Sequence, residues 1–150
     1  MSVRARVEDA SLLWQQGRLE GAFLSVLVAV AATSRRRYGN RHEFGDRAAF
    51  EQFVRDSHSV RLSVEYRGQC QPVEHIFYKW LRCSLLHEGG VPVDIEFVDD
   101  GELGAMSVRA GGAPEYVLKL SHGWFHHLMG AVIEAPENAD LFADWKGHPD

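Results

Sequence analysis

The longest apolar run in the chain is GAFLSVLVAVAA, from Gly21 to Ala32. A helix that crosses a bilayer needs about 20 apolar residues, and charged segments flank this run on both sides. The run therefore predicts a buried helix in a protein core. Three consecutive arginines, Arg35 to Arg37, follow it. They either complement the negative end of that helix or form a patch for an anionic ligand.

Length and charge narrow the class of protein. A chain of 150 residues fits one domain and can bury around two-thirds of the surface that its unfolded form exposes. The formal charge of -5 argues against broad electrostatic binding to a nucleic-acid backbone, although a local basic site is compatible with it. Cys70 and Cys83 lack paired CxxC spacing, and no signal peptide precedes them. We therefore expect a reduced, cytoplasmic protein that is not attached to a membrane.

The N-terminal part of the chain has a helical pattern. From Asp9 to Tyr38, charged and apolar residues alternate in blocks, without the period of two that marks a strand. This pattern predicts one long helix, or a helix interrupted near Gly17 or Gly21. Gly39-Asn40 marks its end.

Two further helices are predicted in the first ninety residues. The segment GDRAAFEQFVRDS has Asp46 as its expected N-cap, and spacings of three and four residues place its apolar side chains on one face. A third helix is predicted from Val73 to Glu88, because Pro72 suits its first turn and Gly89-Gly90 suits its end. The apolar face of the second helix consists of Phe50, Phe53 and Val54.

The remaining segments predict a small β element. The alternation in Val60 to Pro72 is typical of a loop or a short strand. Later, VDIEFVDDG, AMSVRAGG and EYVLKLS are short β-prone pieces separated by Asp-Asp-Gly and Gly-Gly-Ala-Pro turn signals. Ser121 is the expected cap of a last long helix, HGWFHHLMGAVIEA. We predict a single α+β domain, 1–150, with a bundle of about four helices and a small antiparallel β-meander before the last long helix.

The third predicted helix carries a pair of residues suited to phosphate chemistry. In YKWLRCSLLHEGG, Arg82 precedes His87 by five residues. On a regular α-helix the two positions are about 140° apart around the axis and about 7.5 Å apart along it, so they do not share a face. They can act on one substrate if the arginine swings round, if the helix relaxes near Gly89-Gly90, or if a second copy of the chain completes the site. The alternative interpretation is the polar edge of a packing helix.

The chemistry of this pair suits RNA. A histidine with an ordinary pKa near 6.5 can take a proton from a hydroxyl near neutral pH, and a guanidinium fits the oxygens of a phosphate. In RNA the neighbouring 2′-hydroxyl can attack phosphorus once it is deprotonated, and the arginine can stabilise the charge that grows on the phosphoryl oxygens. DNA lacks this nucleophile.

FYKWLRCSLLHEGG resembles the RxxxxH signature of the HEPN superfamily of helical domains. The predicted long and short helices before it agree with the up-and-down bundle of that superfamily. The resemblance implies a metal-independent endoribonuclease without a cofactor, with a composite site at a homodimer interface. It assigns Arg82 as the phosphate clamp and His87 as the general base or acid.

Two neighbours on the same helix are candidate substrate-binding residues. His75, Lys79 and Arg82 are spaced by four and by three, which places them on one stripe, where Lys79 can guide a phosphate. The other interpretation is a solvated basic edge of the helix. Cys83 stands where catalytic members of the superfamily commonly carry a polar residue. It therefore favours the alternative function, a non-catalytic dimeric RNA- or protein-binding module, with a regulatory partner, in a bacterial stress or defence system.

A metal site is a remoter alternative. His122 and His126 have the i, i+4 spacing at which two imidazoles can hold one metal ion, but the sequence offers no third ligand nearby in a known pattern. The simpler interpretation is a helix with surface histidines, in which Trp124, Phe125 and Leu128 are core residues. We therefore predict no metal.

Overall fold

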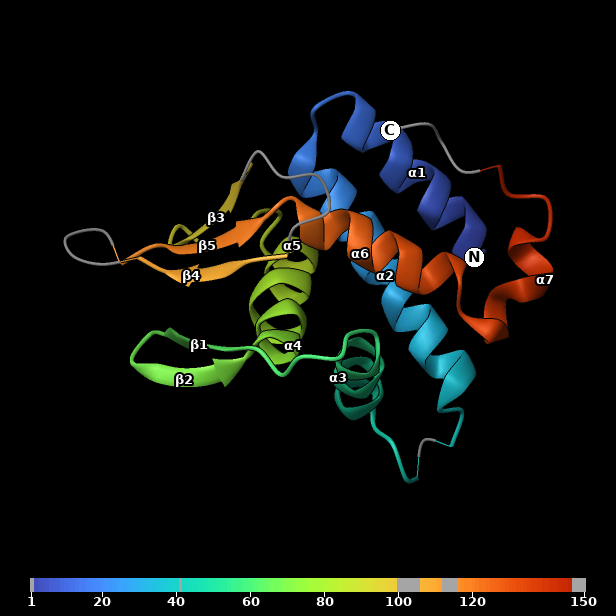
Figure 1. Ribbon diagram of the computed structural model, residues 1–150, viewed down its shortest axis with the longest axis horizontal. Coiled ribbons are helices and arrows are strands. Elements are labelled where there is room, and N and C mark those ends of the chain that lie inside the picture. The colour runs from blue at the N-terminus through green and yellow to red at the C-terminus, as the bar shows by residue number, and fades with distance from the viewer. Residues whose placement is uncertain (1, 41, 100–105, 112–115, 147–150) are drawn as a thin grey trace.

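The structure, a computed structural model, describes residues 2–40, 42–99, 106–111 and 116–146. It confirms the predicted α+β class, with two small sheets beside a set of helices (Figure 1). The helical elements are α1 (Val3–Gln15), α2 (Leu19–Arg37), α3 (Asp46–Asp56), α4 (Val73–His75), η1 (Ile76–Arg82), α5 (Cys83–His87), α6 (Gly123–Ile133), η2 (Pro136–Asn138) and α7 (Ala139–Phe142). The strands are β1 (Ser63–Tyr66), β2 (Gln69–Pro72), β3 (Ile95–Val98), β4 (Val108–Ala110) and β5 (Leu118–Ser121).

The predicted N-terminal helix is a pair of helices. The chain turns back at Gly17, whose φ of 73° lies in the left-handed region that glycine adopts without strain. Arg18 then donates its backbone N–H to the carbonyl oxygen of Leu13 at 2.9 Å, which closes the end of α1. The interruption at Gly17 is thus confirmed, while α1 begins at Val3 and not at Asp9.

Helix α2 lies at the centre of the molecule (Figure 1). The helices α1, α3 and α6 and the segment from η1 to α5 all pack against it. Its apolar run is buried or half-buried, as predicted, because several helices pack around it. The fully buried side chains of this run are Ala22, Phe23, Val26, Leu27, Ala29 and Val30.

The third predicted helix is confirmed to within one residue, but its winding differs from the prediction. The elements α4, η1 and α5 follow one another without a break from Val73 to His87, and we call this span the motif helix. Its middle seven residues, Ile76–Arg82, form a π-helix, in which each amide bonds five residues back. Gly89, with φ of 79°, follows the end of α5, where a left-handed residue stops a helix.

The predicted antiparallel meander is wrong. In the three-stranded sheet the order is β3-β5-β4, and β3 pairs with β5 in parallel. Within this sheet, the pair of β4 and β5 is antiparallel. The central strand β5 buries Leu118 and Leu120, so the most buried strand of this sheet takes the position with two neighbours. The predicted turns Asp99–Gly104 and Gly111–Tyr116 fall largely on residues 100–105 and 112–115, outside the described residues.

The ambiguous segment before the motif helix is a β-hairpin. Strands β1 and β2 are antiparallel, with Tyr66 opposite Gln69. The two turn residues, Arg67 and Gly68, have φ of 51° and 79°, which is the pattern of a two-residue type I′ turn. The hairpin leads directly into the motif helix, whereas residues 57–62 separate it from the end of α3.

Two predicted helix caps are displaced. Helix α3 has Gly45 as its N-cap, so Asp46 is its first residue and not its cap. Ser121 is the last residue of β5, and its hydroxyl oxygen accepts the backbone N–H of Ser107 at 2.8 Å. The Ser121 hydroxyl thus bonds to a segment that is distant in sequence and not to the helix that follows it.

Within the described residues, none of the helices is both long enough and apolar enough to cross a membrane. The run that begins at Gly21 belongs to α2, which is buried by its neighbours in the fold. The two cysteines are free thiols; Cys70 is exposed and Cys83 is half-buried.

Candidate functional site

Arg82 is the last residue of the π-helical part of the motif helix. Its guanidinium carbon lies 5.4 Å from the ring centroid of Tyr78, four residues earlier. Its Nε atom is buried and has no hydrogen-bond partner among the described residues. Because buried N–H groups in native proteins almost always have a partner, an acceptor that reached this donor would satisfy it. π-helical segments are rare and often occur at functional sites.

Arg82 lines a cavity of about 210 Å³ between the motif helix, α2 and the start of α3. We call it the Arg82 cavity. Small apolar side chains of α2 form part of its wall, and the charged groups come from all three helices. Its lining residues are Val28, Ala31, Ala32, Arg35, Asp46, Tyr78 and Arg82.

A second arginine, Arg35, lines the same cavity. Its Nη2 donates to the carbonyl oxygens of Phe44 at 2.9 Å and Gly45 at 3.1 Å. Its Nε lies 3.4 Å from Oδ1 of Asp46, an ion pair without hydrogen-bond geometry. Both Nε and Nη1 of Arg35 are buried without a hydrogen-bond partner among the described residues. The cavity thus has two guanidinium groups with unused donors.

The other two arginines of the run have structural roles. Arg36 donates to Oδ1 of Asn138 at 3.0 Å, and Arg37 makes a two-pronged ion pair with Glu137 at 2.7 and 3.2 Å. The side-chain hydrogen bond to Glu137 raises the pKa of Arg37. The three consecutive arginines therefore point to different neighbours, and only Arg35 lines the Arg82 cavity.

His87 does not line the Arg82 cavity. It is the last residue of α5, and its side chain is exposed. Because it follows Arg82 by five residues in an α-helical turn, it faces a different direction from the cavity. One copy of the chain therefore does not bring the two predicted catalytic residues to a common cavity.

The two predicted substrate-binding residues are also outside it. His75 is half-buried, and its Nδ1 lies 2.7 Å from Oε1 of Glu51 on α3. Lys79 is exposed, with its ammonium nitrogen 4.9 Å from the ring centroid of Trp80. His75 thus has a partner within the fold, whereas Lys79 remains open to a ligand.

The histidines proposed as metal ligands serve a packing role. His122 and His126 both place their rings edge-on against Trp14, with centroids 5.1 Å apart in each case. Trp124, Phe125 and Leu128 are buried, as the simpler interpretation predicted. In the part of the chain that the structure describes, no group of three or more His, Cys, Asp or Glu side chains could hold a metal ion.

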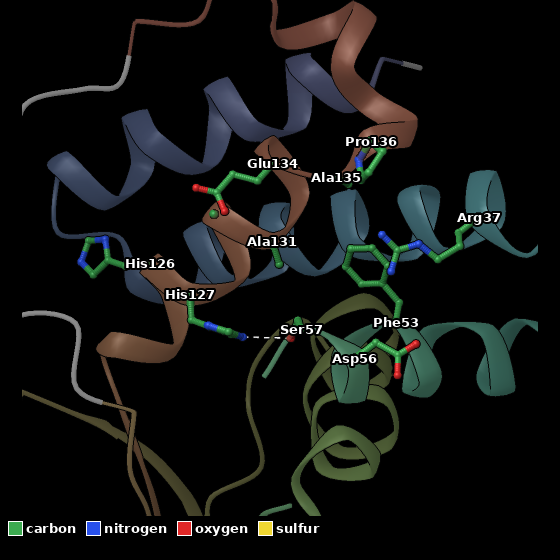
Figure 2. A pocket seen from close by; sticks show the side chains of 11 residues that line it. Arg37, Phe53, Asp56, Ser57, His126, His127, Ala131, Glu134, Ala135 and Pro136 are labelled. Atoms are coloured by element: carbon green, nitrogen blue, oxygen red, sulfur yellow. Dashed lines mark hydrogen bonds between the residues drawn. The ribbon is translucent and has the colours of Figure 1, made fainter. Parts of the chain in front are cut away.

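A second cavity, of about 410 Å³, lies between the end of α3 and α6. Figure 2 shows His127 pointing across it to Ser57, with 2.9 Å between Nε2 and Oγ. The Ser57 hydroxyl donates to the carbonyl oxygen of Val54. It is therefore an acceptor from Nε2–H, and His127 does not act as a base toward it. Burial, followed by the nearby His58, lowers the pKa of His127.

Two charged groups of this second cavity, Asp56 and Arg37, are already paired. Asp56 accepts hydrogen bonds from Tyr38 at 3.0 Å and from Gln52 at 2.8 Å. Arg37 is held by Glu137 and lies 4.7 Å from the ring centroid of Phe53. The only guanidinium among the described residues that line this cavity is held by Glu137, so the cavity has less to offer an anion than the Arg82 cavity, where guanidinium donors are unused.

Comparison with known proteins places the chain in a family. A family model described as Rv1289 matches residues 2–144. The chain belongs to the Rv1289 family. No curated protein and no solved structure matches it.

The Arg82 cavity gives this Rv1289-family chain a means to bind an anion. Two guanidinium groups face it, against one carboxylate, Asp46. A planar guanidinium matches the oxygens of phosphate and carboxylate groups, and its hydrogen bonds to an anion are stronger than neutral ones. Sequence reasoning in this Rv1289-family chain identified Arg82 but missed Arg35 as its companion. The sequence signal for Arg35 was the run of three arginines, which we interpreted as a candidate patch for an anionic ligand. That interpretation did not single out one of the three residues.

Proposed function

We propose that this chain is an RNA-acting domain in which Arg82 binds a backbone phosphate. The observation that carries the proposal is the buried, unpartnered Nε of Arg82 at the wall of a cavity. The pattern RCSLLH supports RNA as the source of the phosphate, because it resembles the HEPN signature. The net charge of -5 fits local binding of one or a few phosphates better than binding along a whole nucleic-acid backbone.

A binding module is the function that the geometry of one chain supports best. Arg82 has a donor to offer, while His87 lies outside the cavity. In this form the domain holds RNA without cutting it, and Lys79, exposed on the same helix, adds a second positive charge for the phosphates that follow.

A metal-independent endoribonuclease is the second candidate, and the exposure of His87 favours it. In a homodimer, His87 of one copy can approach the phosphate held by Arg82 of the other. His87 then takes the proton of the 2′-hydroxyl, whose oxygen bonds to phosphorus as the bond to the 5′-oxygen breaks. The leaving oxygen takes up a proton, so the products are a 2′,3′-cyclic phosphate and a 5′-hydroxyl. The HEPN relationship and the dimer remain predictions.

The test measures binding and cleavage together. Labelled single-stranded RNA and matched DNA are incubated with the protein in EDTA, and bound and cut fractions are followed for the wild type, Arg82→Ala, His87→Ala and Arg61→Ala. Arg61 is the matched control because it is an exposed arginine away from the cavity. Loss of one charge-assisted contact weakens RNA binding by about tenfold or more.

Three outcomes decide between the candidates. RNA binding that Arg82→Ala weakens and Arg61→Ala preserves, without cleavage, supports the binding module. Cleavage of RNA alone, lost in Arg82→Ala and His87→Ala while both variants keep the wild-type melting temperature, supports the endoribonuclease. Equal RNA binding by Arg82→Ala and the wild type, or no RNA binding by the wild type, overturns the proposal.

A further inference from the structure

We infer that Arg35 and Arg82 form a two-arginine site for a single phosphate group. Arg35 belongs to α2 and Arg82 to the motif helix, so the two residues are distant in sequence. They line one cavity, so the site is created by the packing of the motif helix on α2. Naming RNA as the source of the phosphate rests on the proposed function, whereas the site itself takes the phosphate group of any donor.

Unused N–H donors of the two arginines support the site. Nε of Arg82 and both Nε and Nη1 of Arg35 are buried and lack a hydrogen-bond partner among the described residues. A buried donor without a partner is costly, and a charged one more so. The three donors belong to two side chains that line one cavity, so an acceptor with several oxygens that reached them, such as a phosphate group, would satisfy more than one of them.

The charge of the lining residues also favours an anion in the cavity. Two guanidinium groups in a partly apolar cavity repel each other, and Asp46 is the one carboxylate among the lining residues. The cavity therefore carries a net positive charge, which an oxyanion would neutralise. Asp46 is also the first residue of α3, an eleven-residue helix whose N-cap Gly45 has no side chain to cap the free amides. The positive end of that helix adds to the attraction.

Asp46 competes with a phosphate for the guanidinium group of Arg35. Its Oδ1 contacts Nε of Arg35 at 3.4 Å without hydrogen-bond geometry, and its side chain is 66% exposed. An exposed ion pair of this kind is weak, so an incoming phosphate can displace the carboxylate from Arg35. The same negative charge repels the phosphate. Removing it should therefore strengthen binding, which is a change of sign that loss of a merely structural contact would not produce.

The experiment is a calorimetric titration with inorganic phosphate at constant ionic strength, with chloride as the matched salt. It compares the wild type with Arg82→Gln, Arg35→Lys, Asp46→Asn and Arg61→Ala. Arg35→Lys is used because Arg35 also holds the Phe44 and Gly45 carbonyls, and lysine keeps the positive charge but loses the planar fork. A thermal melt of each variant without phosphate reports whether it is folded.

We expect saturable phosphate binding that Arg82→Gln and Arg35→Lys weaken by about tenfold and Asp46→Asn strengthens by several-fold, with Arg61→Ala unchanged. Phosphate binding that is unaffected by Arg82→Gln, or that Asp46→Asn does not strengthen, overturns the two-arginine site. The same titration with a short single-stranded RNA and with adenosine monophosphate distinguishes the sources of the phosphate.

The failure of this inference and that of the proposed function are distinguishable. If inorganic phosphate or the mononucleotide binds with the predicted variant pattern and RNA does not, the two-arginine site stands and the RNA proposal fails. If RNA binding depends on Arg82 but is unchanged in Arg35→Lys and Asp46→Asn, the RNA proposal stands and the two-arginine site fails.

Discussion

The side-chain amide of Asn138 donates a hydrogen bond to the hydroxyl oxygen of Thr33, with 2.9 Å between the two atoms, although 105 residues separate them in the sequence. The same amide donates to the carbonyl oxygen of Val132 at 2.9 Å, and the Thr33 hydroxyl donates to Ala29 at 2.8 Å. Asn138 and Thr33 are fully buried. Because each donor has an acceptor, this network ties η2 to the C-terminal part of α2 without an unpaired donor.

Asn138→Asp should lower the free energy of unfolding by about 2–4 kcal/mol, because a carboxylate cannot donate to Thr33 or Val132. The size of the side chain hardly changes, so packing is preserved, and the contact with Arg36 survives. Urea unfolding at pH 7 measures the change.

The matched control for that variant is Asn40→Asp. Asn40 is exposed and uses its Oδ1 as an acceptor for the backbone N–H of His42, a role that aspartate keeps. Its stability should therefore match the wild type. Equal stability of both variants would show that the buried network contributes nothing.

Asp94 joins the hairpin to the three-stranded sheet. It accepts hydrogen bonds from the Tyr66 hydroxyl at 2.7 Å and from Arg67 at 2.8 and 2.9 Å. Asp94→Asn should lower the free energy of unfolding by about 1–3 kcal/mol, since the charge-assisted pair with Arg67 is lost. Glu65→Gln, on the exposed face of β1, is the control and should change little.

The Asp94 pair also predicts a pH dependence. The hydrogen bond from Arg67, with help from Tyr66, lowers the pKa of Asp94 below its ordinary value. The carboxylate therefore contributes stability above its unfolded pKa, near 3.9, and that contribution is lost as the pH falls through the lower folded pKa. Urea midpoints between pH 2 and 6 should fall less steeply in Asp94→Asn than in the wild type. Parallel curves for the two proteins would contradict this.

His127 should make the protein less stable in weak acid. Its folded pKa lies below the ordinary 6.5, so the unfolded chain binds a proton first as the pH falls. Stability is complete above 6.5 and decreases as the pH falls from there to the folded pKa. In His127→Gln this decrease should be smaller, whereas His42→Gln, at an exposed loop position, should retain it. Unfolding free energies at half-unit steps from pH 5 to 7.5 are the measurement.

Two glycine substitutions should change the stability of the protein in opposite directions. A Cβ at Gly111 would lie 2.3 Å from the carbonyl oxygen of Val117, a backbone atom that cannot move aside. Gly111→Ala should therefore lower the free energy of unfolding by about 2 kcal/mol or more. Gly130, inside α6, has no atom within 4 Å of an added Cβ, so Gly130→Ala should stabilise the protein by about 0.5–1 kcal/mol. Thermal melts of the two variants should shift in opposite directions.

Local patterns predicted the positions of the main helices, but not their number: the expected four are exceeded because the N-terminal helix is two helices and the described residues include the short elements η2 and α7. The three- and four-residue spacing of Phe50, Phe53 and Val54 gave the buried face of α3, and Gly17 marked the turn between α1 and α2. The parallel pairing of β3 with β5 was not predictable in the same way. A period of two identifies a strand but not its neighbour, because the partner is chosen by packing between segments that are distant in sequence.

The candidate site was predictable in part. The spacing of Arg82 and His87 drew attention to the motif helix, and the structure gives Arg82 a cavity. Arg35 could not be separated from the two arginines that follow it, because consecutive helical residues point about 100° apart and the neighbour of each is unknown until the helices are packed. The roles of Arg82 and His87 toward RNA stay predictions.

The π-helical winding of Ile76–Arg82 has a consequence for how the site can be lost. A π-helical turn is an α-helical turn that holds an additional residue, so the direction of Arg82 depends on the winding of the residues before it. If this span wound as a regular α-helix with all its residues kept, Arg82 would turn by roughly 100° about the helix axis and leave the cavity, with every functional side chain still in the chain. The winding of this span, as much as residue identity, thus defines the site, and substitutions that favour α-helical winding there would remove Arg82 from the cavity without replacing it.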